Sequence, residues 1–186
     1  MNGFDGAFSY GFYEGTLQKL IHLYKYGGIY TLSRPLAELL SRAMPPAREF
    51  DFITAVPMHW WKRWRRGFNQ SELLARELSK RTGICSASLL RRARLTDPQA
   101  GLSDSARRRN VAGSFRGRRL KIEASRILLV DDVLTTGATA SACALALKRA
   151  GAAHVTVLTL ARADRRVAAP QPAEQAKAHG ADGGGR

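Results

Sequence analysis

The stretch I-L-L-V-D-D-V-L-T-T-G-A-T, from Ile127 to Thr139, decides the fold of this chain. Its first four residues are apolar, which predicts a central parallel strand buried on both faces. Two carboxylates, Asp131 and Asp132, are expected to end that strand, and a threonine–glycine turn leads into a predicted helix over 139–150. A second strand is predicted over 154–160. The stretch therefore predicts a strand–helix–strand unit of a parallel sheet.

The same stretch predicts a site for an anionic ligand. Ligands of open parallel sheets bind at the carboxyl ends of the strands, and the free N–H groups at a helix start attract phosphate. Thr135, Thr136 and Thr139 add hydroxyl donors, and Gly137 lets a ligand approach the backbone closely. The neighbouring carboxylates offer acceptors for vicinal hydroxyls. Helix capping would explain a shorter pattern of this kind, but the complete string favours a phosphate loop.

The rest of the chain supplies further elements of an α/β domain. Apolar spacing and glycine or proline stops predict an edge strand at 7–13, helices at 14–26, 32–43 and 71–80, a buried strand at 52–56, a short strand at 89–90, and a long mobile loop at 94–110. We therefore predict an N-terminal helical segment over 1–50, an α/β domain over 51–163, and a disordered tail over 164–186, where alanine, proline, glutamine and glycine dominate.

The charge of the chain is strongly positive. Thirty Lys and Arg residues against fifteen Asp and Glu give a formal net charge of +15, and residues 62–121 hold 17 basic and 4 acidic residues. Such a field attracts phosphorylated metabolites, nucleic acid or acidic partners. A solvated arginine-rich surface explains the composition equally well.

The cysteines and the apolar runs indicate the compartment. Cys85 and Cys143 are far apart in sequence, so they form neither a zinc-ligand pair nor a disulfide framework, and we expect no zinc site. A reduced, cytoplasmic location is the simpler interpretation. No apolar run approaches the roughly 18 residues of a membrane span, and the first ten residues lack the pattern of a secretory signal.

Three further motifs narrow the interpretation. They are R-G-F-N-Q at Arg66 to Gln70, P-Q-A-G-L at Pro98 to Leu102, and R-R-N-V-A-G-S-F at Arg108 to Phe115. Together with the stretch at 127–139, they resemble the ComF/GntX family of phosphoribosyltransferase-like proteins, which is linked in bacteria to DNA uptake and carbon metabolism. The resemblance covers about residues 10–162. It implies a type I phosphoribosyltransferase fold, with a central, mostly parallel sheet flanked by helices and a small N-terminal hood.

The resemblance also implies roles for individual residues. In such proteins the acidic pair, here Asp131 and Asp132, handles the ribose hydroxyls of 5-phosphoribosyl-1-pyrophosphate (PRPP), and we take it as the catalytic pair and as the contact with PRPP-bound Mg²⁺. The 5-phosphate would lie on Thr135, Thr136, Gly137, Ala138 and Thr139. The pyrophosphate would lie near Pro57 and Met58, with Arg65 and Arg66 as candidates because guanidinium forks suit phosphate oxygens.

The segment around 94–110 matches a flexible loop that closes over the site in phosphoribosyltransferases. Its candidate residues are Gln99, Arg107, Arg108 and Asn110. The arginines either cap a short helix or reach into the closed site, and the sequence does not choose between these roles.

Two functions follow from the resemblance. The first is an enzyme of nucleotide metabolism that transfers, or formerly transferred, phosphoribosyl from Mg-PRPP to an unidentified nitrogen acceptor. The alternative is a non-enzymatic adaptor in DNA uptake and transformation, which binds single-stranded DNA or a helicase-type partner. Trp60, Trp61 and Trp64 alternate with basic residues and suit base stacking, although packing against the N-terminal helices explains them as well. A homodimer is compatible with the apolar helices near the start.

The chain departs from its apparent relatives at two places. ComF-like proteins often begin with a cysteine-bearing zinc module, and no paired cysteines precede Cys85, so we expect that module to be missing. Purine phosphoribosyltransferases carry a carboxylate immediately before the Thr-Gly pair, where this chain has Thr135. Purine salvage is therefore disfavoured.

Overall fold

The computed structural model describes residues 3–46, 49–58, 64, 66–92, 114–118 and 122–163. The whole of the predicted loop at 94–110 and all of the predicted tail at 164–186 lie outside these residues. The description below therefore concerns the sheet, its helices and the short strands beside them.

The elements follow the predicted order closely. They are β1 (Gly6–Phe12), α1 (Gly15–Tyr26), the 3-10 turn η1 (Tyr30–Leu32), α2 (Ser33–Ala43), β2 (Phe52–Ala55), α4 (Gln70–Thr82), β3 (Cys85–Ser86), β4 (Leu90–Arg92), β5 (Phe115–Gly117), β6 (Arg126–Leu134), α6 (Ala138–Arg149) and β7 (His154–Arg162). The helices and the longer strands confirm the predictions made from apolar spacing. The short strands β3 and β5 were not predicted, because two or three residues show no periodicity.

Five strands form one parallel sheet in the order β1-β7-β6-β2-β3. The predicted edge strand is confirmed, because β1 pairs with β7 at the outer edge of the sheet. The α/β fold class with a parallel central sheet is therefore confirmed. The division at residue 50 stays a prediction, and β1 shows that the first segment contributes to the same sheet as residues 51–163.

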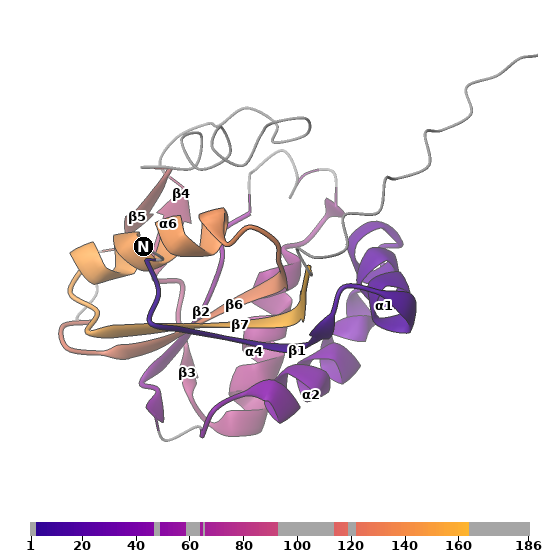
Figure 1. The fold of residues 1–186 in the computed structure, drawn as a ribbon, viewed down its shortest axis with the longest axis horizontal. Helices are drawn as coiled ribbons and strands as arrows, with labels where there is room; N and C mark the ends of the chain where they lie inside the picture. Colours follow the sequence, from indigo (N-terminus) through magenta and orange to yellow (C-terminus); the bar gives the residue numbers. More distant parts are fainter. Residues whose placement is uncertain are drawn as a thin grey trace, which may run out of the picture.

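Helices cover both faces of the sheet (Figure 1). One apolar cluster joins α1, α2 and α4 to the sheet through residues such as Leu128 and Val130 of β6. The other joins α6 and the β4–β5 pair to the opposite face through Ile127 and Leu129. All four of these β6 side chains are 0% exposed, which confirms the predicted strand buried on both faces.

Strand β6 is longer than predicted. We expected it to end in two carboxylates, but its pairing with β7 continues through Asp131 opposite Thr159 and Val133 opposite Ala161. The extension arises because β7 itself runs to Arg162 and offers a partner over the whole length. Asp131 and Asp132 therefore lie within the paired part of the strand rather than after its end.

Strands β4 and β5 form an antiparallel pair that packs against α6. The approach is close, because a Cβ added at Gly117 would come within 2.5 Å of the Ala150 Cβ atom. Glycine is therefore required where the pair meets the end of α6. In the described part of the chain, none of the helices combines the length and the hydropathy needed to cross a membrane.

Candidate functional site

The predicted site residues gather at the carboxyl edge of the sheet. Strands β2 and β6 are neighbours, with Ala55 opposite Val130. This pairing brings Pro57 and Met58, which follow β2, to the same edge as the stretch 131–139. The sheet therefore unites two segments that are more than seventy residues apart in sequence.

Asp132 is buried and forms an ion pair with a lysine that sequence reasoning missed. The Lys25 Nζ atom lies 2.8 Å from Asp132 Oδ1, and the two side chains are 17% and 13% exposed. Burial lowers the pKa of Lys25, but the charge and hydrogen bond of Asp132 outweigh it, so the pKa is raised. Lys25 therefore stays protonated and supplies a permanent counter-charge to one carboxylate of the pair.

The position of Lys25 is fixed by contacts between α1 and the start of α4. The Tyr24 hydroxyl donates to the Gln70 carbonyl oxygen at 3.0 Å, and the Gln70 Nε2 atom donates to the Lys25 carbonyl oxygen at 3.4 Å. Burial, together with the nearby Asp132 charge, raises the pKa of Tyr24, so its hydroxyl remains a donor. These contacts hold the end of α1 against the carboxyl edge of the sheet.

Asp131 has a different environment. Its Oδ1 atom accepts hydrogen bonds from the Ser71 hydroxyl at 2.8 Å and from the Asp132 backbone N–H at 2.9 Å. Burial and the neighbouring Asp132 charge nevertheless raise the pKa of Asp131 from 3.8 to about 7. One carboxylate of the pair is thus neutralised by a lysine, and the other holds its proton to a higher pH than an ordinary aspartate does.

The acidic pair alone is a poor metal site, but it suits a metal shared with a ligand. No group of three or more His, Cys, Asp or Glu side chains able to hold a metal occurs among the described residues. Mg²⁺ usually takes one or two carboxylates and completes its shell with water and substrate phosphates. Asp131, with no cation bonded to it in the described structure, is the better placed of the two acids for that role.

The predicted phosphate loop opens α6. Gly137 precedes the helix in the left-handed region with φ 74°, which glycine adopts without strain. The first turn of α6 contains no acidic residue, so the positive end of the helix dipole is not neutralised locally. Thr135 is exposed, whereas Thr136, Ala138 and Thr139 are half-buried beside it. The turn thus presents hydroxyls and backbone to solvent at a positive helix end.

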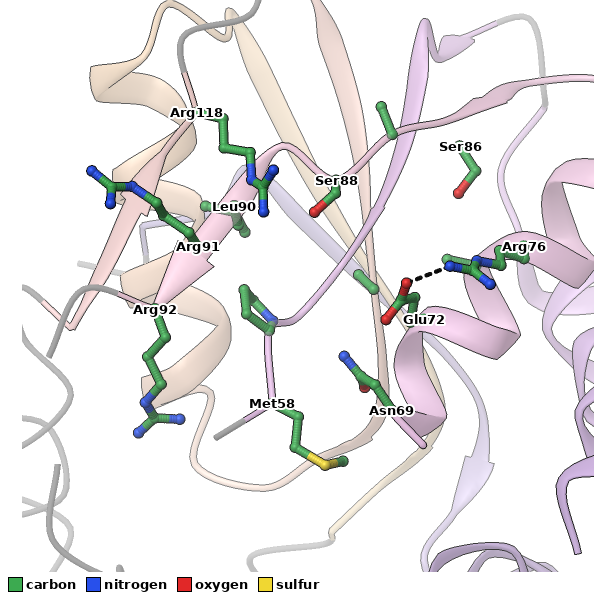
Figure 2. Close-up of a pocket in the computed structure, with 14 residues that line it drawn as sticks. Met58, Asn69, Glu72, Arg76, Ser86, Ser88, Leu90, Arg91, Arg92 and Arg118 are labelled. Carbon is green, nitrogen blue, oxygen red and sulfur yellow. Dashed lines mark hydrogen bonds and ion pairs between the residues drawn. The ribbon is translucent and has the colours of Figure 1, made fainter. Parts of the chain in front are cut away.

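Pro57 and Met58, predicted to contact pyrophosphate, line a cavity of about 350 Å³ (Figure 2). Arg66 does not line it. Its guanidinium carbon lies 4.8 Å from the centre of the Tyr26 ring, and its Nη1 atom donates to Gln70 Oε1 at 3.3 Å. The pyrophosphate assignment of Arg66 stays a prediction, and Arg65 lies outside the described residues.

Several residues at this edge were not found from the sequence. Lys25 follows buried Ile21 by four positions and therefore lies on the same face of the helix. A lysine on an apolar helix face indicates that an acidic side chain of the packed neighbour pairs with it. Ser71, at the start of α4, carried no such signal. The cavity walls include four arginines that were not predicted: Arg76, Arg91, Arg92 and Arg118.

The remaining predicted residues cannot be placed. Gln99, Arg107, Arg108 and Asn110 of the predicted closing loop lie outside the described residues, as do Trp60 and Trp61. Trp64 is described and is 74% exposed.

Comparison with known proteins identifies the family. No family model matches the chain. Over 162 residues, it is 35% identical to competence protein F of Haemophilus influenzae, and the match covers 82% of this chain and 71% of that relative. The chain belongs to the ComF family. This ComF chain is also 36% identical to the DNA utilization protein YhgH of Escherichia coli K12 (81% and 69% covered) and 28% identical to competence protein ComFC of Streptococcus pneumoniae (81% and 65% covered).

Among solved structures, the ComF chain is similar to the glutamine PRPP amidotransferase of B. subtilis complexed with ADP and GMP. The TM-score is 0.49 at 25% identity, and the match covers 69% of this chain and 26% of that one. A structure of the allosteric regulatory enzyme of purine biosynthesis matches with the same TM-score at 23% identity, over 70% of this chain and 25% of that one.

Replacing Lys25 tests the ion pair. Lys25→Met should lower the free energy of unfolding by about 3 kcal/mol, because it leaves Asp132 buried without a counter-charge. The second change, Asp132→Asn, should recover part of that loss. Urea unfolding of both variants measures these changes in the free energy of unfolding. Lys19→Met on the same helix is exposed and should change stability by less than about 0.5 kcal/mol. Equal losses for the two lysine variants would contradict the assigned role.

The raised pKa of Asp131 has a consequence for stability. The folded state holds the Asp131 proton to about pH 7, whereas an unperturbed aspartate loses it near 3.8. Ionisation of this residue therefore destabilises the fold as pH rises from 4 to 8. Asp131→Asn should remove that dependence and stabilise the protein by about 2 kcal/mol at pH 8. Thermal unfolding across this range provides the measurement, and identical pH slopes for wild type and variant would exclude this effect.

Proposed function

We propose that this ComF chain binds PRPP together with Mg²⁺ and transfers its phosphoribosyl group to a nitrogen acceptor. The observation that carries the proposal is the passage of β6 through Asp131 and Asp132 into a threonine–glycine turn at the start of α6. Acceptors for sugar hydroxyls and donors for a phosphate thus lie within nine residues. Membership of the ComF family, whose motifs resemble those of phosphoribosyltransferases, supports the same proposal.

The ligand would lie along the carboxyl edge of the sheet. The 5-phosphate would bind the turn at 135–139, where the helix end is positive, and the ribose would contact the acidic pair. The pyrophosphate would extend toward Pro57 and Met58 at the neighbouring strand end. Mg²⁺, when bound, would neutralise charge on the pyrophosphate oxygens. Lys25 would pair with Asp132 and orient it throughout.

The reaction would break the bond between ribose C1 and the pyrophosphate oxygen and form a bond from C1 to the acceptor nitrogen. Pyrophosphate leaves with the bonding electrons, and the acceptor nitrogen gives up one proton. Positive charge develops on the ribose during the exchange, so the carboxylates beside it would contribute electrostatic stabilisation. Thr135, where purine enzymes carry a carboxylate, offers no base at physiological pH, so an acceptor that is not a purine is favoured.

Binding of Mg-PRPP can be measured by calorimetric titration. We expect binding by the wild type and its loss in Asp131→Asn/Asp132→Asn, because the ribose contacts are removed. The matched control is Glu49→Gln/Glu123→Gln, which removes two carboxylates near the amino end of β6 and should bind as the wild type does. Absence of binding by folded wild type would exclude the proposal.

A second variant tests the phosphate contact separately, in case the double aspartate variant does not fold. Thr136→Val/Thr139→Val removes two hydroxyls of the phosphate loop without altering any charge. It should weaken PRPP binding by at least about tenfold, since each hydrogen bond to a charged group contributes roughly 1.5–3 kcal/mol. Full affinity in this variant would show that the turn does not hold the phosphate.

A role in DNA handling is the second candidate, because the relatives are named competence and DNA utilization proteins. Three aromatic side chains are exposed, with Tyr26, Tyr30 and Trp64 at 59%, 63% and 74%. Arg66 stacks on the first of them, Tyr26. Aromatic faces interleaved with arginine bind single-stranded bases without sequence preference. This surface, in the cytoplasm, would bind single-stranded DNA or a helicase-type partner carrying it.

Fluorescence anisotropy with a labelled oligo-dT tests this candidate. Affinity should fall steeply with salt, because phosphate contacts release counterions. Tyr26→Ala/Trp64→Ala should weaken binding by about tenfold or more, as expected for lost stacking. Phe8→Ala/Tyr10→Ala, on the distant edge strand β1, is the control. No measurable binding at moderate salt, or equal effects of both double variants, would rule out this surface.

A further inference from the structure

The cavity beside Pro57 and Met58 is separate from the acidic pair and the phosphate loop. Its described walls come from the end of β2, the start of α4, residues 86–92 and Arg118 (Figure 2). None of its described lining residues belongs to β6, β7 or the turn at 135–139. Strand β3 flanks β2 on the side away from β6, and the cavity lies on that side. A ligand here would be divided from Asp131 and Asp132 by β2 and its following loop.

The cavity is rich in arginine. Four arginines line it against a single carboxylate, Glu72, and that carboxylate is engaged at 2.6 Å by Arg76. For Arg91 and Arg118, the described structure contains no ion pair with an acidic side chain. Positive charge in excess of its local partners is the condition for binding an anion with more than one negative charge.

The β4–β5 strand pair fixes the backbone positions of Arg91 and Arg118. Leu90 of β4 pairs with Gly117 of β5, and the Arg118 N–H donates to the Leu89 carbonyl oxygen at 2.8 Å. Arg91 and Arg118 therefore flank one backbone pairing at the base of the β4–β5 pair. In Figure 2, the Arg118 side chain reaches toward Ser88, whose hydroxyl also lines the cavity. A guanidinium and a hydroxyl placed in this way suit phosphate oxygens.

A buried acceptor lies on the opposite wall. Asn69 is 8% exposed, and its Nδ2 atom donates to the Val56 carbonyl oxygen at 3.4 Å. Its Oδ1 atom has no hydrogen-bond partner in the part of the chain that the structure describes. A buried acceptor without a partner is destabilising, so its presence beside a cavity indicates a missing donor. An N–H group of a ligand would supply such a donor.

The space between these polar walls is lined by apolar side chains. They are Ala55, Pro57, Met58, Ala75, Ala87 and Leu90. The volume of about 350 Å³ falls within the range of small-molecule sites, roughly 300–1,000 Å³. The cavity thus combines a cationic wall, an apolar interior and a buried acceptor.

We propose that this cavity is a second ligand site, which binds a small phosphorylated molecule bearing an N–H group, of the mononucleotide class. Arg91 and Arg118 bind its phosphate, the apolar interior holds its ring, and Asn69 accepts its N–H. The site shares Pro57 and Met58 with the proposed pyrophosphate contact, but it contains no residue of the phosphate loop or the acidic pair, so separate variants test the two sites. Its contact with Pro57 and Met58 gives the ligand a direct influence on the loop that follows β2.

Calorimetric titration of AMP and of GMP into the full chain tests the proposal. At least one should bind the wild type, and Arg91→Gln/Arg118→Gln should weaken it by about tenfold or more, as expected for lost charged hydrogen bonds. Arg34→Gln/Arg149→Gln is the matched control, because it removes two exposed arginines elsewhere and lowers the net charge equally. It should bind as the wild type does.

Two further variants locate the ligand. Asn69→Ala should weaken mononucleotide binding severalfold while leaving the weaker binding of inorganic phosphate unchanged, because phosphate has no N–H to lose. Thr136→Val/Thr139→Val should leave mononucleotide binding intact. Thermal unfolding confirms that each variant is folded, and the arginine variant carries the test if Asn69→Ala does not fold.

Three results would overturn the proposal. One is the absence of AMP and GMP binding by folded wild type. Another is an equal loss of affinity in the arginine variant and its charge-matched control, which would indicate nonspecific attraction to a basic protein. The third is a loss of mononucleotide binding in Thr136→Val/Thr139→Val but not in Arg91→Gln/Arg118→Gln, which would place the ligand on the phosphate loop.

Discussion

Two consecutive carboxylates continue a strand that is buried on both faces, and the surrounding elements are arranged to keep them there. Asp132 points to the face covered by α1, where Lys25 neutralises it. Asp131 receives a hydroxyl from the start of α4 and retains a raised pKa. Burying a charge without a partner is costly. The two acids can therefore be buried at this strand end only because α1 and α4 supply their partners.

Because of this constraint, the N-terminal segment is an integral part of the domain that carries the candidate site. Helix α1 supplies the cation for a carboxylate that lies more than a hundred residues later in the chain. Strand β1 extends the sheet beyond β7, and Asp5 reinforces that end by accepting hydrogen bonds from Lys148 Nζ at 2.6 Å and the Val155 N–H at 2.8 Å. The first elements of the chain therefore complete both the sheet and the candidate site.

Charge is divided across the carboxyl edge of the sheet. On the β6 side, the acidic pair and the helix end would serve a sugar phosphate, with one acid already balanced by lysine. On the far side of β2, arginines outnumber carboxylates around the cavity. Four of the seventeen basic residues counted between residues 62 and 121 thus share one concave region. Such concentration strengthens the local field and favours binding of multiply charged anions.

The sequence alone determined the parallel α/β class, the order of the longer elements and the location of the threonine–glycine turn that opens α6. These follow from local patterns: four apolar residues before two acids, apolar spacing along helices, and a threonine–glycine pair before the last helix. Only the tertiary structure decided that β6 continues past its acids, that Lys25 pairs with Asp132, and that Asn69 and the arginines of 76–118 surround one cavity. Those features depend on contacts between residues distant in the chain, and strand pairing and charge neutralisation across a sheet leave no periodic trace in either partner's sequence.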